Sequence, residues 1–288
     1  MVTRKALKTQ IVSIPPRSSG TELHLAVSEV ATGSYDATRI MAGSMNWVTP
    51  LDLCGLRAVL EFSALNLDEV FFDCPIDTSV HNYAERMALY EDLPDNVTLS
   101  RARPSLNTNA RETLIELNRV DSPESVEHIL EAVQKAAYHV FGRGRVATAC
   151  GTAIAAAAEN VLDHAESPIG AFIAAQRYEN SGLELACVDL GFGIPTTLRR
   201  RAQYAQLSDI EAIECALEDG VTSANDGDVG RGAGLADLCK TVRLAGHSTL
   251  TIHSGRAYVT VGSGAQIAQV TTPATAVVGT WIAVRLKP

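Results

Sequence analysis

Two glycine-containing segments, each beside a regular element, constrain the fold of this chain more than any other feature. Residues 189–194 (DLGFGI) follow an apolar run that is typical of a buried strand. Residues 230–235 (GRGAGL) open a stretch with helical periodicity that ends at about Leu244. Glycine permits a close backbone approach that any Cβ would prevent. The two segments therefore predict a pocket between the end of a strand and the N-terminus of a helix.

The first segment has the chemistry of a purine site. Asp189 ends the predicted strand, and its carboxylate can accept a hydrogen bond from the exocyclic amine of adenine, which guanine lacks at that position. Gly191 and Gly193 would let the backbone pass close under a base, against which Ile194 can lie. Thr280, just before the last predicted strand, is expected to form a hydrogen bond near the base.

The second segment has the pattern of an anion site. Successive glycine amides followed by a helix N-terminus attract phosphate, and an arginine among them adds positive charge. The spacing fits neither the Walker A loop nor the Rossmann turn. The residues expected to line this phosphate site are Gly230, Arg231, Gly232, Ala233, Gly234 and Leu235.

An alanine-rich helix predicted over residues 152–165 brings further polar groups. Asn160 and Asp163 are three residues apart, and Asn160 and His164 are four apart, so an α-helix would place all three on one flank. The carboxamide oxygen of Asn160 is a suitable ligand for Mg²⁺, which takes few protein oxygens and binds phosphate oxygens as well.

The segment between the glycine clusters, residues 196–229, is long enough to close over a ligand and exclude water. It contains a helix-like stretch at 208–217. Thr222 and Ser223 follow with hydroxyls that can reach a phosphate. The basic run at 199–201 is interpreted as a solvated surface. We therefore expect a lid over the pocket.

As one ordered set, N-x-x-x-H at 160–164, D-x-G-x-G at 189–193, G-x-G-x-G-L at 230–235 and G-T at 279–280 resemble the GHKL superfamily of ATP-binding domains. This superfamily is shared by gyrase B, heat-shock chaperones, MutL and sensor histidine kinases. The resemblance covers about residues 122–286. It implies a layer of helices on a mixed sheet, Mg²⁺ on Asn160, adenine on Asp189 and a lid between the glycine clusters. The G-F-G-I-P run and the Thr-Ser lid look closest to the anti-sigma-factor-like branch.

The chain departs from this family at one position. Catalytic members usually carry a glutamate four residues before the asparagine, and here that residue is Ala156. Glu159 is adjacent to Asn160 and is rotated by about 100° around an α-helix. Losing an acid–base group typically costs about 10²–10⁴ in rate. The sequence thus predicts ATP binding with weak or no hydrolysis, and it identifies no catalytic residue.

The front of the chain predicts a smaller α/β unit. Residues 21–29 alternate like a strand, a helix is expected to begin at Thr49-Pro50, a buried strand at 68–75, and another helix at 77–90. This portion resembles the STAS-like domains of bacterial regulators, on the W-V-T-P-L run at 47–51, the V-F-F-D strand at 70–73 and Y-A-E-R-M at 83–87. An unrelated α/β cap is the alternative.

A helix is also expected from Ser122-Pro123 to about Phe141, and strands are expected at 183–190, 249–254, 258–261 and 281–286. These patterns give the expected organisation of the 288 residues. Residues 1–20 are a flexible arm, residues 21–108 the STAS-like domain, and residues 109–288 the ATP-binding domain. The fold class is α/β, with an α+β two-layer sandwich of the Bergerat type. Six scattered cysteines without a C-x-x-C pair indicate reduced thiols. We expect a cytoplasmic protein, with no signal peptide and no membrane span.

Three functions remain open at this point. The first is a regulatory module in which ATP and Mg²⁺ order the lid and change a surface that binds a protein partner. The second is a serine/threonine protein kinase of the anti-sigma type, with the front domain as substrate. A mechanical ATPase fits least, because its members carry a transducer domain with a catalytic lysine, for which we expect no room in 288 residues. The net charge of −9 argues against nucleic-acid binding by a basic surface. The sequence leaves open whether the chain forms a homodimer.

Overall fold

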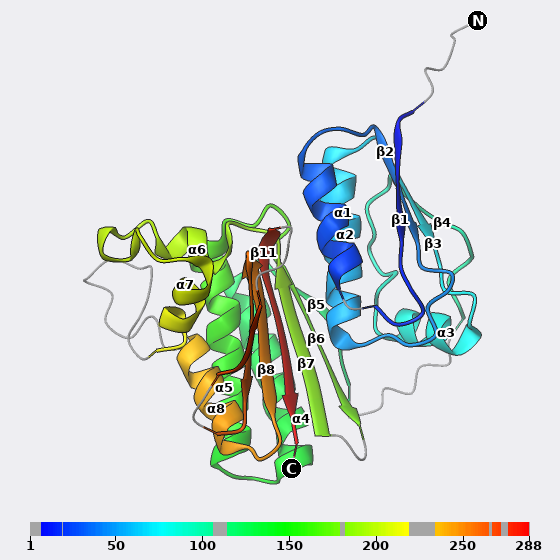
Figure 1. The fold of residues 1–288 in the computed structure, drawn as a ribbon. Coiled ribbons are helices and arrows are strands. Elements are labelled where there is room, and N and C mark those ends of the chain that lie inside the picture. The colour runs from blue at the N-terminus through cyan, green and yellow to red at the C-terminus, as the bar shows by residue number, and fades with distance from the viewer. Residues whose placement is uncertain are drawn as a thin grey trace, which may run out of the picture.

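The computed structural model describes residues 7–18, 20–105, 114–178, 182–218, 234–264, 267–271 and 276–287. Figure 1 shows two sheets with helices packed on them. The elements in chain order are β1 (Thr9–Ser13), α1 (Thr21–Ala31), β2 (Ala37–Met41), α2 (Pro50–Asn66), β3 (Glu69–Asp73), α3 (Thr78–Arg86), β4 (Val97–Leu99), β5 (Leu114–Val120), α4 (Pro123–Phe141), α5 (Arg145–Asn160), the π-helix η1 (Val161–Ala165), β6 (Ala171–Tyr178), β7 (Gly182–Asp189), α6 (Gly193–Leu198), the 3₁₀-helix η2 (Ala202–Tyr204), α7 (Asp209–Ala216), α8 (Gly234–Leu244), β8 (Thr249–Gly255), β9 (Ala257–Gly262), β10 (Ile267–Thr271) and β11 (Val277–Leu286).

The front of the chain forms a parallel sheet with the strand order β1-β2-β3-β4. The α/β character predicted for this part is confirmed. The flexible arm expected over residues 1–20 is wrong for Thr9–Ser13, which forms β1. The strand was not predicted because Gln10, a polar residue, occupies one of its buried positions. The Gln10 side chain donates a hydrogen bond to Glu29 (2.9 Å) and accepts one from Thr38 (3.0 Å).

The strand expected over residues 21–29 is also wrong, since this segment is helix α1. Its buried apolar residues are Leu23, Ala26, Val27 and Val30. These follow the i, i+3, i+4, i+7 spacing of one helical face. The alternation that suggested a strand is a coincidence within that helical period.

The predicted helix starts are confirmed by their caps. The Thr49 hydroxyl accepts a hydrogen bond from the Asp52 N–H (3.2 Å), and the Asp52 carboxylate accepts one from the Thr49 N–H (2.8 Å). Asp77 caps α3, and Ser122 caps α4 ahead of a proline. Gly142 ends α4 with a φ of 70°, a conformation that residues with a side chain rarely adopt.

The second sheet has seven strands in the order β10-β9-β8-β11-β7-β6-β5. Every pairing among its described residues is antiparallel, whereas the family resemblance implied a mixed sheet. The strands predicted at 183–190, 249–254, 258–261 and 281–286 correspond to β7, β8, β9 and β11. Strands β5, β6 and β10 were not predicted.

Both faces of this sheet are buried over the central strands β6, β7 and β11. Residues such as Ile173, Leu185 and Ile282 share one hydrophobic core with α4, α5 and α8. On the opposite face, Phe172, Val188 and Trp281 share a second core with α1 and α2. Figure 1 shows α1 and α2 lying between the two sheets. The expected two-layer sandwich therefore carries a further helix layer and the parallel sheet on its second face.

The contact between α2 and the large sheet is very close at Gly55. A Cβ on Gly55 would lie 2.4 Å from Cζ3 of Trp281 and 2.9 Å from Cδ1 of Leu23. Real Cβ atoms essentially never come this near to other heavy atoms. The indole of Trp281, 2% exposed, therefore rests directly on the backbone of α2.

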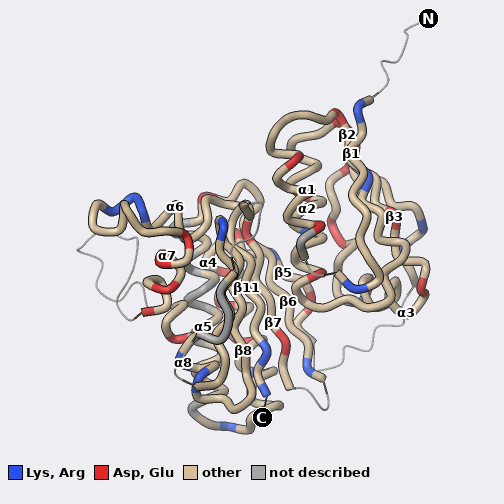
Figure 2. The backbone as a smooth tube through the Cα atoms, viewed as in Figure 1, with Lys and Arg blue, Asp and Glu red and all other residues tan. Residues whose placement is uncertain are grey.

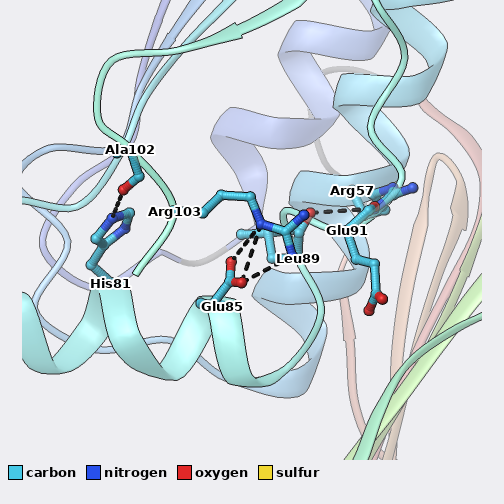
Figure 3. Close-up of polar contacts among 7 residues, drawn as sticks. All are labelled: Arg57, His81, Glu85, Leu89, Glu91, Ala102 and Arg103. Atoms are coloured by element: carbon cyan, nitrogen blue, oxygen red, sulfur yellow. Dashed lines mark hydrogen bonds and ion pairs between the residues drawn. The ribbon is translucent and has the colours of Figure 1, made fainter. Parts of the chain in front are cut away.

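A buried arginine ties α2 to the neighbouring turn and to strand β5. The Arg57 guanidinium donates to the carbonyl oxygens of Leu89, Glu91 and Asp92, two of which are drawn in Figure 3. It also pairs with Glu61 (2.8 Å), which in turn pairs with Arg119 of β5 (2.6 Å). A charge buried in this way requires such partners.

The basic residues after β4 are bound within the chain rather than simply solvated. Arg101 donates to the carbonyl oxygen of Pro75 (2.7 Å), and Arg103 pairs with Glu85 (2.9 Å). A ring nitrogen of His81 lies 3.2 Å from the carbonyl oxygen of Ala102 (Figure 3). Residues 106–113 lie outside the described part, so the boundary at residue 108 stays a prediction.

All six cysteines carry free thiols, and all but Cys215 are buried. Burial raises the pKa of the Cys150 thiol to about 12, so this group stays protonated near neutral pH. Among the described residues, no helix combines the length and the apolar composition needed to cross a lipid bilayer.

We predict that Gly55→Ala destabilises the protein. Overpacking a core typically costs about 1–3 kcal/mol, and the rigid indole places this site toward the upper end. Alanine returns at most about 1 kcal/mol of helix propensity. Chemical denaturation should therefore show a net loss of at least about 1 kcal/mol. Gly43→Ala is the matched control, because its Cβ would meet Ile76 at an ordinary 3.6 Å. A Gly55→Ala variant as stable as the wild type would contradict this packing.

Candidate functional site

Asp189 lies at the C-terminal end of β7, where its side chain is 4% exposed. The carboxylate accepts a hydrogen bond from the Gly191 N–H at 2.9 Å. Hydrogen bonds from Thr280, its cross-strand neighbour on β11, also stabilise the ionised carboxylate. The carboxylate is therefore held between the loop after β7 and strand β11.

Burial shifts the ionisation of this group. Desolvation raises the pKa of Asp189 to about 6, against the opposing effect of hydrogen bonds from Gly191 and Thr280. Such a shift in a carboxylate is frequent at functional sites. At neutral pH the group is still mostly ionised, which is the form that accepts hydrogen bonds from an amine.

The glycines around Asp189 are required because segments of the chain that are distant in sequence approach one another closely there. A Cβ on Gly191 would lie 1.9 Å from the carbonyl oxygen of Ala165, and one on Gly193 would lie 2.7 Å from that of Gly279. Gly279 itself has a φ of 76° and passes beside the backbone of Asp189. The D-x-G-x-G pattern predicted that Gly191 and Gly193 make room for a base. Their neighbours in the structure are instead Ala165 of η1 for Gly191, and Ser254 of β8 and Gly279 of β11 for Gly193.

Ser254 is a central residue that the sequence analysis missed. Its hydroxyl, fully buried, donates to the carbonyl oxygen of Gly279 (2.8 Å) and accepts from the Ile194 N–H (3.0 Å). It also lies 3.3 Å from the Thr280 hydroxyl. Ser254 thus fixes both Ile194 and Thr280 beside Asp189. Only the pairing of β8 with β11 brings it there, so no local sequence signal identifies it.

The end of α5 is held against the same glycine segment. The Phe192 N–H donates to the carbonyl oxygen of Ala165 (2.9 Å), and the Leu190 N–H donates to the Ser167 hydroxyl (3.3 Å). The end of η1 therefore lies beside the loop that follows Asp189. Because η1 directly continues α5, the backbone at Asn160 lies near the end of β7.

Asn160 is the last residue of α5, and Asp163 and His164 belong to the π-helix η1. The shared flank expected for these residues assumed a regular α-helix through residue 165. A π-helix changes the angular spacing, and such turns are frequent at functional sites. The side chains of these three residues lie outside the described part of the chain, so their orientation stays a prediction.

The phosphate site is only partly described. Gly234 begins α8 and is buried, and Leu235 packs against the core shared with α5. The remaining predicted phosphate and lid residues fall outside the described range: Thr222, Ser223, Gly230, Arg231, Gly232 and Ala233. Helix α8 packs beside α5, so the two predicted sides of the pocket come from neighbouring elements.

The basic run after α6 is engaged within the chain. Arg199 donates to the carbonyl oxygen of Leu207 (2.7 Å) and pairs with Asp209. Arg200 pairs with Glu166 (2.6 Å) and lies 4.5 Å from the ring centre of Phe192. Figure 2 shows this basic stretch beside the acidic residues of α7. At least the first two arginines serve to position α6 and the Phe192 loop, rather than forming a free cationic surface.

A separate cavity of about 370 Å³ lies where α2, the turn at 88–94 and strands β5 and β6 meet. Its charged lining consists of Arg57, Glu61, Glu91, Asp92 and Arg119. Arg57 and Arg119 both pair with Glu61, so these charges are largely neutralised within the protein. The cavity is a structural junction and offers no unpaired buried group to a ligand.

No family model matches the chain, and a search of the curated proteins finds no significant match. The likeness to the GHKL superfamily and to STAS-like domains consequently rests on the motifs alone. The structure defines a mixed α/β protein with a parallel sheet and an antiparallel sheet. Its candidate site is a buried carboxylate at a strand end, next to the end of a helix.

We predict that Asp189 makes stability depend on pH in a defined direction. Its folded pKa of about 6 lies above the ordinary value of 3.8, so folding strengthens proton binding. This contribution to stability is fully present below about pH 3.8 and is lost as the pH rises through about 6. Relative to Asp189→Asn, the wild type should gain stability between pH 7 and pH 4.5 in chemical denaturation. Exposed Asp95→Asn controls for the lost charge, and a pH-independent difference would refute the assignment.

Proposed function

We propose that this chain is an ATP- and Mg²⁺-binding regulatory protein. In this proposal, nucleotide orders the segment between the glycine clusters and changes a surface that binds a protein partner, with weak or no hydrolysis. Ordering a segment around a γ-phosphate is a known switching device. The observation that carries the proposal is the buried carboxylate of Asp189, which Gly191 and Thr280 fix at the end of β7.

The surroundings of Asp189 support a purine ligand. A buried carboxylate is stabilised by hydrogen-bond donors, and the exocyclic amine of adenine would supply one. Ile194 is partly buried and its N–H donates to Ser254, and in this proposal its side chain would lie against the purine ring. A guanine would present a carbonyl oxygen in place of that amine. The donor set therefore favours adenine.

The end of α5 supports the proposed placement of phosphate and metal. Asn160 would contribute its carboxamide oxygen to Mg²⁺, and the amides before α8 would receive the phosphates. When bound, Mg²⁺ neutralises phosphate charge. The backbone supports this division of roles, because α5 packs beside α8 and η1, which continues α5, packs beside α6.

The proposed lack of efficient hydrolysis depends on position 156. In α5, this position lies one turn before Asn160, and position 159 is rotated away by about 100°. Ala156 has no group that can activate a water or a hydroxyl. The protein-kinase alternative requires phosphoryl transfer to a protein, and it would be favoured if label from γ-phosphate moved onto protein.

We predict that Asp189→Asn removes ATP binding and leaves the fold intact. The asparagine amide would bring a second donor opposite the adenine amine and would lack the negative charge. Calorimetry with ATP, ADP and GTP, with and without Mg²⁺, should show adenine-nucleotide binding by the wild type and none by Asp189→Asn. Asp95→Asn, a substitution of an exposed aspartate, should bind as the wild type does. Unchanged affinity of Asp189→Asn would exclude adenine recognition by this carboxylate.

We further predict that Ala156→Glu raises ATP turnover, because it restores an acid–base group one turn before Asn160. A gain within the usual range for such groups is about 10²-fold or more. Ala156→Gln, which has the same length without the carboxylate, is the control. An absence of gain in the glutamate variant would mean that the missing carboxylate does not limit hydrolysis.

A further inference from the structure

Two neighbouring cross-strand rows of the large sheet face opposite ways. Asp189 is paired with Thr280, which is paired with Ser254, and these three residues form the candidate site. The adjacent row runs through Val188 and Trp281 to His253. Successive residues of a strand point to opposite faces. The second row therefore faces α1 and α2, directly behind the site.

The residues of the second row are closely packed against α1 and α2. The ring of His24 on α1 lies 4.2 Å from the ring of Trp281 and 4.9 Å from that of His253, measured between centroids. His253 lies 4.1 Å from Tyr258 in the same way. On the α2 side, Trp281 touches the backbone of Gly55. Close-packed contacts of this kind transmit small displacements rather than absorbing them.

The cluster contains one unsatisfied polar atom. His24 is 6% exposed, and its Nε2 has no hydrogen-bond partner. Burial, together with the nearby His253, lowers the pKa of His24 to about 3, and burial lowers that of His253 to about 4. Both rings are thus neutral at physiological pH. A buried unpaired polar group costs about 1–3 kcal/mol, so α1 is held here by ring packing rather than by polar bonds.

We propose that α1 and α2 regulate the Asp189 site through Trp281, so that the front of the chain is a built-in regulator of nucleotide affinity. This inference rests on the proposed function. A ligand bound by Asp189 and Thr280 fixes the start of β11, and Trp281 is the next residue. Any displacement of β11 is passed to Gly55 of α2 and to His24 of α1. By linkage, the packing of these helices must alter ligand affinity in return.

The chain offers a direct probe, because its two tryptophans are Trp47 and Trp281. Trp47→Phe leaves Trp281 as the sole tryptophan, 2% exposed and on the opposite sheet face from the site. We expect ATP with Mg²⁺ to change its emission in a saturable way, with the same midpoint as calorimetry. Trp281→Phe leaves Trp47, which is 47% exposed and stacked on Tyr178. This control should show no ATP-dependent change.

The reverse direction is tested with Gly55→Ala, which displaces Trp281 without touching the site. Coupling between sites typically amounts to about 5–150-fold in affinity. We expect ATP affinity to fall at least about fivefold, the lower end of that range. Gly43→Ala, in the same part of the chain but without a close contact, should keep wild-type affinity. His24→Phe is a milder second variant that retains a ring and should also shift the affinity.

The outcomes separate this inference from the proposed function. ATP binding by calorimetry with constant Trp281 emission, or with equal affinity in Gly55→Ala and Gly43→Ala, overturns the coupling and leaves the proposed function standing. Absence of ATP binding to the wild type overturns both. If Gly55→Ala does not fold, the Trp281 emission and the His24→Phe affinity still decide the question.

Discussion

The structure depends on the burial of both faces of the central strands β6, β7 and β11. An antiparallel sheet commonly keeps one face in solvent, but here α1 and α2 cover the second face and rest on it through Gly55 and Trp281. Because this contact joins backbone to a large rigid ring, it fixes the parallel sheet, the helix layer and the antiparallel sheet to one another. The candidate site lies one residue away from it along β11.

Local rules account for the elements that were predicted correctly. Caps and prolines at Thr49 and Ser122 mark helix starts whatever the rest of the chain does. The strand before Asp189 is apolar because both of its faces are buried. Segments whose periodicity is ambiguous were less predictable. Gln10 is a buried polar residue within a strand, and α1 shows an alternation that belongs to a helix.

The candidate site was predictable in its residue types but not in its construction. Asp189 and its glycines form a recognisable motif, and the structure places Asp189 beside Thr280 as a cross-strand neighbour. The contribution of Ser254 depends on the register of β8 against β11, which no local pattern encodes. The glycines fit the backbone of Ala165 and Gly279, a contact between segments that are distant in sequence. The π-helix after Asn160 was likewise not predicted, because the prediction assumed the 3.6-residue period of an α-helix.

The proposed regulator differs in kind from a tethered substrate. A substrate domain must separate from the site to present a hydroxyl, whereas α1 and α2 share a continuous core with the back of the site. The measurement that tests the central claim most directly is a structure determined with a non-hydrolysable ATP analogue and Mg²⁺. The account predicts that the adenine amine lies within hydrogen-bond distance of the Asp189 carboxylate. The nucleotide should lie on the face of the antiparallel sheet that α5 and α8 cover. Nucleotide bound elsewhere, or an Asp189 carboxylate closed off from it, would contradict the account.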